Sequence, residues 1–77
     1  MASLVAALDT AFTPAVGDFI VQVTKGEANL MRQNAAGLDF VLVGPCAQGA
    51  ALIVSNPIAG AIYKFVSSNN ATVRADQ

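Results

Sequence analysis

Cys46 carries the most readily used chemistry in this chain, because a thiolate is both a nucleophile and a redox-active group. It follows Gly44 and Pro45 in a segment that ends at Gly49. A nucleophilic cysteine needs a base, and the chain has no histidine, so a carboxylate or a lysine would have to activate it. The surroundings favour a small, partly buried thiol without a catalytic role. One cysteine excludes a disulfide within the chain but leaves one between copies open.

Three carboxylates, Asp18, Glu27 and Asp39, are the residues that could act as a general acid and base. Each falls at the start of a predicted strand or in a turn, where carboxylates are ordinary surface residues. A weak calcium site between protomers would need closely spaced oxygen ligands, and no loop provides them. The sequence therefore predicts no catalytic residue, no metal site and no cofactor.

Two other local patterns resemble modification or ligand motifs. Asn70-Ala71-Thr72 matches the acceptor pattern for N-glycosylation. The N-terminal apolar run has no Lys or Arg before it, so it does not predict a secretory signal, and the pattern is most simply a polar turn. The turns at Gly44 and Gly60 lack the Gly-Lys-Ser/Thr of a phosphate-binding loop.

The chain that contains these candidate residues is small and apolar. It has 77 residues, of which 55% are hydrophobic and 12% charged, with a net charge of −1. This composition excludes intrinsic disorder, and four scattered cations make a poor phosphate-binding surface, so no nucleic-acid partner is expected. Small folds commonly need disulfides, metals or oligomerisation. We therefore expect apolar surface to be buried against further copies or a larger partner.

Residues 40–63 carry no charge and are long enough to span a bilayer as a helix. Turn signals at Gly44-Pro45, Gln48-Gly49 and Ser55-Asn56-Pro57 divide this stretch into short apolar runs. A helix through lipid would have to absorb two prolines and several polar side chains. A membrane partner is therefore not expected, but a membrane-inserted helical coat or pilin-like protein stays as an alternative.

The pattern of short apolar runs between turns is typical of β-strands. Lys25-Gly26-Glu27 is predicted to be a tight reversal, residues 34–37 a hairpin turn, and residues 67–70 a polar turn. The connections are too short for parallel crossovers. We expect an all-β fold, a small antiparallel sandwich or barrel of about six short strands, at residues 18–24, 28–33, 38–43, 50–54, 61–66 and 71–75.

Alternation along the strands predicts which side chains form the core. Phe19, Val21 and Val23 point to one face of their strand. The run 38–43 is apolar on both faces apart from Asp39, which indicates a strand covered on both sides. Alternation also places four aromatic side chains in the core: Phe19, Phe40, Tyr63 and Phe65. One of these four could instead anchor a protein interface.

Thr13-Pro14 separates an N-terminal segment from the body of the chain. We predict an arm or edge segment over residues 1–14 and a β domain over residues 15–77. The arm would suit contact with a neighbouring subunit. The predicted contact residues lie in the arm and in two loops: Leu4, Val5, Leu8, Cys46 and Ile58.

Three sequence stretches carry a resemblance to a known group. They are Gly17-Asp18-Phe19-x-Val21-x-Val23, the run from Gly49-Ala50 through Val54-Ser55-Asn56-Pro57 to Tyr63-x-Phe65-Val66, and the C-terminal 71–77. Over residues 12–77 this pattern resembles small β-rich virion proteins of tailed bacteriophages, which decorate capsids or lie at the base of fibres.

The resemblance implies a non-enzymatic structural role in the virion, with no cofactor. It also implies a symmetric homo-oligomer that contacts a major capsid protein or another virion protein. We therefore expect a capsid decoration or cement protein that stabilises the particle through repeated contacts. The alternative is a tail- or fibre-associated module that binds a receptor or glycan, although its predicted loops lack the exposed aromatic residues expected of one.

Overall fold

The computed structural model describes residues 3–35, 37–49, 51–67 and 70–77, and within them the chain forms β-strands and no helix. This confirms the predicted all-β class. One strand more than expected is present among the described residues, because the N-terminal segment contributes a short strand of its own. The seven strands are β1 (Ser3–Val5), β2 (Gly17–Lys25), β3 (Ala28–Gln33), β4 (Val41–Cys46), β5 (Ala51–Asn56), β6 (Ile62–Val66) and β7 (Thr72–Asp76).

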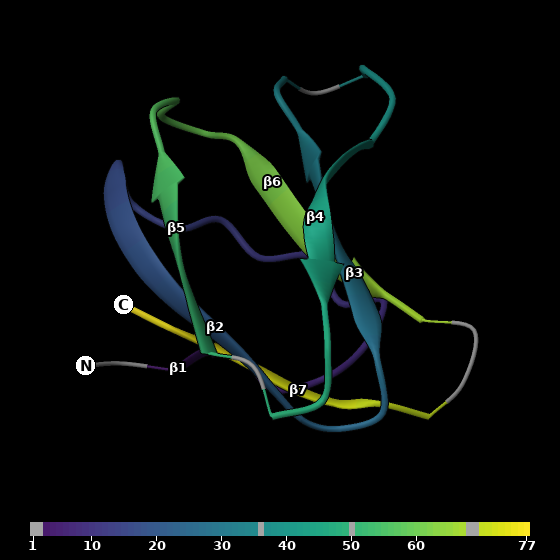
Figure 1. The fold of residues 1–77 in the computed structure, drawn as a ribbon. Coiled ribbons are helices and arrows are strands. Elements are labelled where there is room, and N and C mark those ends of the chain that lie inside the picture. Colours follow the sequence, from purple (N-terminus) through teal and green to yellow (C-terminus); the bar gives the residue numbers. More distant parts are fainter. Residues whose placement is uncertain (1–2, 36, 50, 68–69) are drawn as a thin grey trace.

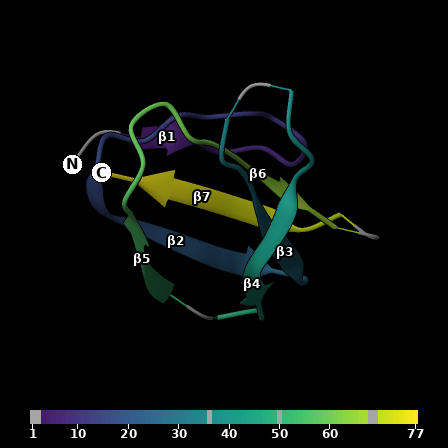
Figure 2. The same cartoon turned by 90° about the horizontal axis from the view of Figure 1, so that it is seen from above.

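The strands form two antiparallel sheets, one with the order β1-β7-β2-β5 and the other with the order β4-β3-β6. Figure 2 shows β3 and β4 crossing β2 and β7 at a steep angle, so the two sheets pack as crossed layers. Only the β3–β4 hairpin joins two neighbours of one sheet through a single turn region. The other connections pass between sheets or skip a strand.

In β2, β3 and β7, alternation determines which face of the strand is buried, as the sequence predicts. In β2, Phe19, Val21 and Val23 are each 1% exposed, whereas Ile20 and Gln22 between them are partly exposed and the flanking Asp18 and Thr24 are exposed. In β3, Ala28 and Leu30 are buried, and in β7 Val73 is buried between two exposed neighbours. Side chains one residue apart point to opposite faces of a pleated strand, so these assignments need no tertiary information.

Two strands and one turn differ from the prediction. The predicted strand 38–43 begins three residues later in the structure and runs through the segment that was expected to be a loop, Gly44 to Cys46. The predicted strand 50–54 is extended to Asn56. The reversal at Gly26 is present, but it carries the chain from β2 in one sheet to β3 in the other, so it is not the tip of a hairpin.

The hydrophobic core is centred on four aromatic rings, and one of them was not predicted. Phe12 is 6% exposed, and its ring lies 6.0 Å from that of Phe19, 5.9 Å from Tyr63 and 6.0 Å from Phe65, measured between centroids. Phe40, which was predicted to point inward, lies partly exposed with the Lys64 ammonium 4.3 Å from its ring centroid. It sits in the loop before β4, where strand alternation does not apply.

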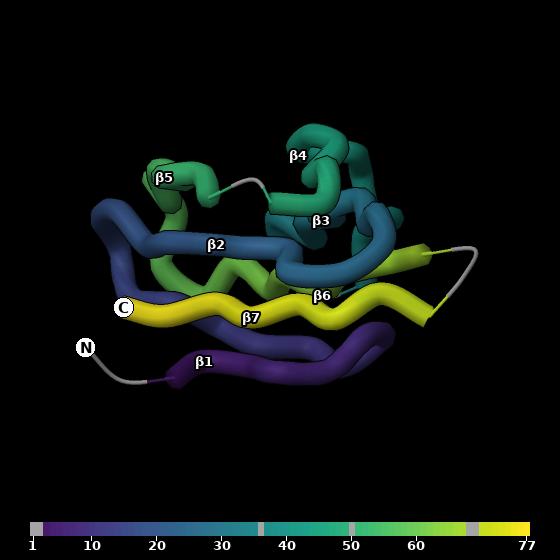
Figure 3. Tube along the Cα trace, turned by 60° about the horizontal axis from the view of Figure 1, so that its bottom comes forward, coloured from purple at the N-terminus to yellow at the C-terminus, as the bar shows by residue number. Residues whose placement is uncertain are grey.

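The N-terminal segment lies along its own chain. β1 pairs with β7, and Val5 is buried at 7% exposure. Farther along, Phe12 exchanges two backbone hydrogen bonds with Tyr63 of β6, at N–O distances of 2.9 and 2.8 Å. The segment thus connects the four-stranded sheet to the three-stranded sheet, and Figure 3 shows it running beside β7. Residues assigned to an arm in the sequence analysis therefore close one side of the two-sheet structure.

The uncharged stretch over residues 40–63 forms β4, β5 and the start of β6, not a membrane-spanning helix. No helix in the described part of the chain is long and apolar enough to cross a membrane. The described residues of this stretch therefore do not form the helix that the helical-coat alternative assumed. Some sequence predictions lie outside the described residues: the start of the apolar N-terminus, Ala36 in the hairpin turn, Ala50 at a strand start, and Ser68 and Asn69 in the polar turn.

Candidate interaction surface

Four strands lie at sheet edges, and two of them are protected in ways that natural sheets commonly use. β1 is only three residues long. β6 is covered by the N-terminal segment, where the Asp9 amide donates to the Phe65 carbonyl at 2.8 Å and Phe12 pairs with Tyr63. Neither strand offers a long row of free backbone groups to another chain.

The edge formed by β4 is irregular. Pro45 has no backbone N–H to donate to a further strand. The register with β3 also shifts between Leu30 and Met31, so that Leu30 pairs with Gly44 but Met31 pairs with Leu42, and Val43 has no partner. A bulge and a proline both discourage a new strand from pairing along an edge.

The edge formed by β5 has none of these protections. Its six residues pair with β2 without a register shift, from Gly17 opposite Asn56 to Gln22 opposite Ala51. The strand contains no charged residue and no proline. Its other side has no partner strand among the described residues. β5 is thus a regular, uncharged edge with free backbone donors and acceptors.

Exposed apolar side chains gather around these two edges. In the described part of the chain, the large hydrophobic residues that are exposed lie in β4, in β5 or beside the end of β5, apart from Leu38 in the β3–β4 loop. Those at the two strands are Val16, Val41, Leu42, Val43, Leu52, Ile53 and Ile58. Val16 belongs to this group because the next residue, Gly17, pairs with the last residue of β5. Three of them, Val43, Leu52 and Ile53, line one cleft, and exposed apolar residues that gather in this way are typical of an interaction site.

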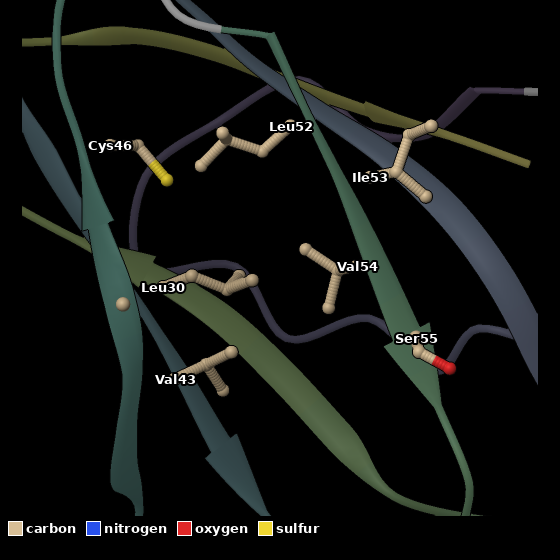
Figure 4. Close-up of a pocket in the computed structure, with 8 residues that line it drawn as sticks. Leu30, Val43, Cys46, Leu52, Ile53, Val54 and Ser55 are labelled. Atoms are coloured by element: carbon tan, nitrogen blue, oxygen red, sulfur yellow. The ribbon is translucent and has the colours of Figure 1, made fainter.

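An open apolar cleft lies between β4 and β5. Its volume is about 340 Å³, and its lining residues come from β3, β4 and β5. Figure 4 shows Leu30, Val43 and Cys46 on one side of it and Leu52 and Val54 on the other. Leu52 pairs with the buried Val21 and so shares its face, yet it is 42% exposed. The two strands that border the cleft, β4 and β5, are edge strands of different sheets, and Figure 1 shows them as separate arrows.

Asn56 fixes the end of β5 in place. Its side chain is 1% exposed, and its amide group donates to the carbonyls of Pro14 and Ala15, both at 3.2 Å. Its side-chain oxygen accepts the Tyr63 hydroxyl at 3.1 Å and the Ile58 amide at 3.4 Å. A buried side chain with all of its polar atoms bonded acts as a rigid connection between the sheets. The sequence identified Asn56 only as part of a turn signal.

The segment that leads into β5 is tied to β2 and to the turn that follows it. The Gly49 amide donates to the Val23 carbonyl at 2.8 Å, and the Gln48 side-chain oxygen accepts the Gly26 amide at 3.3 Å. Hydrogen bonds to the body therefore hold the last residue of β5, Asn56, and the segment just before the strand. The edge of β5 is presented in a fixed position despite its lack of a second neighbour.

Cys46 lies at the end of β4 with its side chain in the cleft wall. It is 3% exposed, and burial raises the pKa of its thiol. A buried thiol with a raised pKa holds little thiolate at neutral pH, so Cys46 is a poor nucleophile and a poor candidate for a disulfide between copies. It contributes packing to the cleft.

The predicted contact residues differ in how far they are buried. Val5 and Cys46 belong to the core, and Leu4 and Leu8 pack against it while partly buried. Ile58, at 36% exposure, lies two residues beyond β5 and next to the surface described above. Sequence reasoning missed Leu52 and Ile53, although the uncharged stretch that contains them was visible.

Polar and charged groups are not concentrated at this surface. Asp18, Glu27 and Asp39 are exposed, at the start of β2, in the β2–β3 turn and in the loop before β4. No group of three or more potential metal ligands occurs in the part of the chain that the structure describes. The Arg32 guanidinium lies 6.0 Å from the Tyr63 ring centroid, and its buried Nε has no hydrogen-bond partner among the described residues.

No protein-family model, curated protein or solved structure matches the chain.

Proposed function

We propose that the chain is a non-enzymatic structural protein of a virus particle, of the bacteriophage capsid decoration type. It acts in many copies, which contact each other and a major capsid protein, and it stabilises the particle mechanically. The observation that supports this proposal is the apolar, uncharged surface formed by β4, β5 and their ends. The virion setting comes from the sequence resemblance over residues 12–77.

The mechanism follows from the chemistry of that surface. Each copy that buries apolar side chains across a seam between capsid subunits raises the free energy needed to separate those subunits. Contacts that are weak individually become strong when many copies bind the same particle. No charged group has to be desolvated along β4 or β5, which removes a common cost of forming an interface.

An assembly role is better supported than glycan recognition. Glycan-binding loops usually present aromatic rings, and here Phe12, Phe19, Tyr63 and Phe65 are buried in the core. The fifth aromatic residue, Phe40, is partly exposed but has the Lys64 ammonium over its ring. The exposed apolar groups are aliphatic, which fits burial in a protein interface.

Fractionation of virus particles tests this proposal. Particles purified on a density gradient from the source that carries the gene are probed with an antibody against the chain. We expect the chain to migrate with intact particles in a fixed ratio to the major capsid protein. We also expect particles that lack the chain to open at a lower temperature than particles that contain it. Recovery of the chain only in the particle-free fractions would refute the virion assignment.

A further inference from the structure

The edge of β5 has the properties of a strand-pairing site. It is six residues long, unbroken in register with β2, free of charge and proline, and anchored at its last residue and just before its first. β1, β4 and β6 are each protected by shortness, by a bulge with a proline, or by a covering segment. Because proteins protect edges that must stay unpaired, a single unprotected edge indicates one that is used.

We propose that β5 pairs with β5 of a second copy of this chain, antiparallel and about a two-fold axis. The two four-stranded sheets then form one continuous sheet of eight strands. This proposal rests on the proposed function and names the surface through which copies meet. Two identical antiparallel strands satisfy each other's free backbone groups at once, so the association closes at a dimer.

The side chains of β5 are compatible with this self-pairing. The register that places Ile53 opposite the same residue of the second copy also places Leu52 opposite Val54. Directly opposite residues in an antiparallel pair share a face. Ile53 therefore meets its equivalent on the outer face, and Leu52 meets Val54 on the cleft face. Every one of these pairs is aliphatic, and no like charges are brought together.

Composition also favours a second copy over an unrelated protein. Interfaces between different proteins commonly depend on Trp, Tyr or Arg anchors, whereas the large apolar residues that are exposed in the described part of this chain are all Val, Leu or Ile. Interfaces between identical subunits are more apolar. The total accessible surface is 4343 Å², so a standard interface of about 800 Å² per partner would use under a fifth of it. Val16, Ile58 and the cleft wall extend the contact beyond the strand itself.

The test is the mass of the purified chain in solution, measured by sedimentation equilibrium over about 1–500 μM. We expect a monomer of 7.9 kDa in equilibrium with a species of twice that mass. In the Ile53→Lys variant two lysines would face each other across the dimer, and we expect the dissociation constant to rise by at least about tenfold. Ile53 is 73% exposed, so the monomer fold should tolerate the change.

Leu38→Lys is the matched control, because it makes the same kind of change at a residue that is 55% exposed and lies in the β3–β4 loop, away from β5. It should dimerise like the unmodified chain. Hydrogen exchange of the unmodified chain is the second measurement, and it stays decisive if Ile53→Lys does not fold. Backbone amides on the free side of β5 should exchange more slowly as the protein concentration rises.

Several results would overturn the proposal: a monomer at the highest concentration, a dimer that survives Ile53→Lys, dissociation by Leu38→Lys as well, or β5 amides whose exchange ignores concentration. The two proposals can fail separately. A β5-paired dimer that is absent from particles would leave the pairing intact and refute the virion role. A particle-bound chain that is monomeric alone would refute the pairing and leave the virion role intact.

Discussion

Removing the Asn56 side chain should destabilise the fold more than any other single polar substitution that we consider. Asn56→Ala deletes the donors to Pro14 and Ala15 and the acceptor for the Tyr63 hydroxyl. The Ala15 carbonyl keeps a second donor, the Gln77 side-chain amide at 3.0 Å. The substitution therefore leaves two buried groups without partners, the Pro14 carbonyl and the Tyr63 hydroxyl, and it also removes the acceptor of the part-buried Ile58 amide.

The expected magnitude follows from those two groups. A buried polar group without a partner costs about 1–3 kcal/mol, so Asn56→Ala should lower the free energy of unfolding by about 2–6 kcal/mol. A domain of this length is stable by roughly 4–12 kcal/mol, so this is a large fraction of the total. Tyr63→Phe removes only the hydroxyl and should cost about 1 kcal/mol, with a loss of about 4–8 °C in Tm.

A double-mutant cycle separates the bond between the two side chains from their other contributions. In the Asn56→Ala background the Tyr63 hydroxyl already lacks its partner. Tyr63→Phe should then be neutral or stabilising, with a coupling energy of about 1–3 kcal/mol. Asn29→Ala is the control, because Asn29 is exposed on β3, and it should change stability by no more than about 0.5 kcal/mol.

The assay is urea unfolding followed by far-UV circular dichroism, since the chain has no tryptophan and Tyr63 is its only tyrosine. All variants must be compared at one protein concentration, because self-association of the folded state would raise the apparent stability. The reasoning would be refuted if Asn56→Ala cost no more than Asn29→Ala. Additive effects of the Asn56 and Tyr63 substitutions would equally contradict it.

Three further predictions concern the core, a turn and the thiol. Phe12→Ala should cost about 3–5 kcal/mol by thermal unfolding, and an unchanged Tm would show that Phe12 does not belong to the core. Gly26→Ala should destabilise more than Gly37→Ala, because both have positive φ (75° and 86°) but only at Gly26 would the new Cβ lie 3.1 Å from the Ala71 Cα. Cys46 should react with Ellman's reagent at pH 8 far more slowly when folded than in urea, because burial raises its pKa and blocks access; equal rates would contradict its placement. Since the pKa is raised by folding, Cys46 supports stability fully below its unfolded pKa of about 8.5, and this contribution is lost as the pH rises through the folded value.

The sequence by itself determined the all-β class and the buried face of most strands. Phe19, Val21, Val23 and Leu30 are buried where alternation places them, because a pleated strand turns each successive side chain to the opposite face. Apolar and polar residues in alternation therefore carry their own burial pattern. The same reasoning located the hairpin between β3 and β4, whose turn is local in the chain.

Tertiary structure alone decided which strands are neighbours and which edges stay free. Phe12 meets Tyr63 across 50 intervening positions of chain, and Gly17 meets Asn56, so neither contact leaves a local pattern. The apolar run 38–43 predicted a strand covered on both sides, yet Val41, Leu42 and Val43 are exposed in the structure. Alternation in the sequence indicates which face of a strand is buried. Strand pairing depends instead on contacts between residues that are far apart in the sequence, and these contacts place β5 at a sheet edge with β2 as its one neighbour among the described residues.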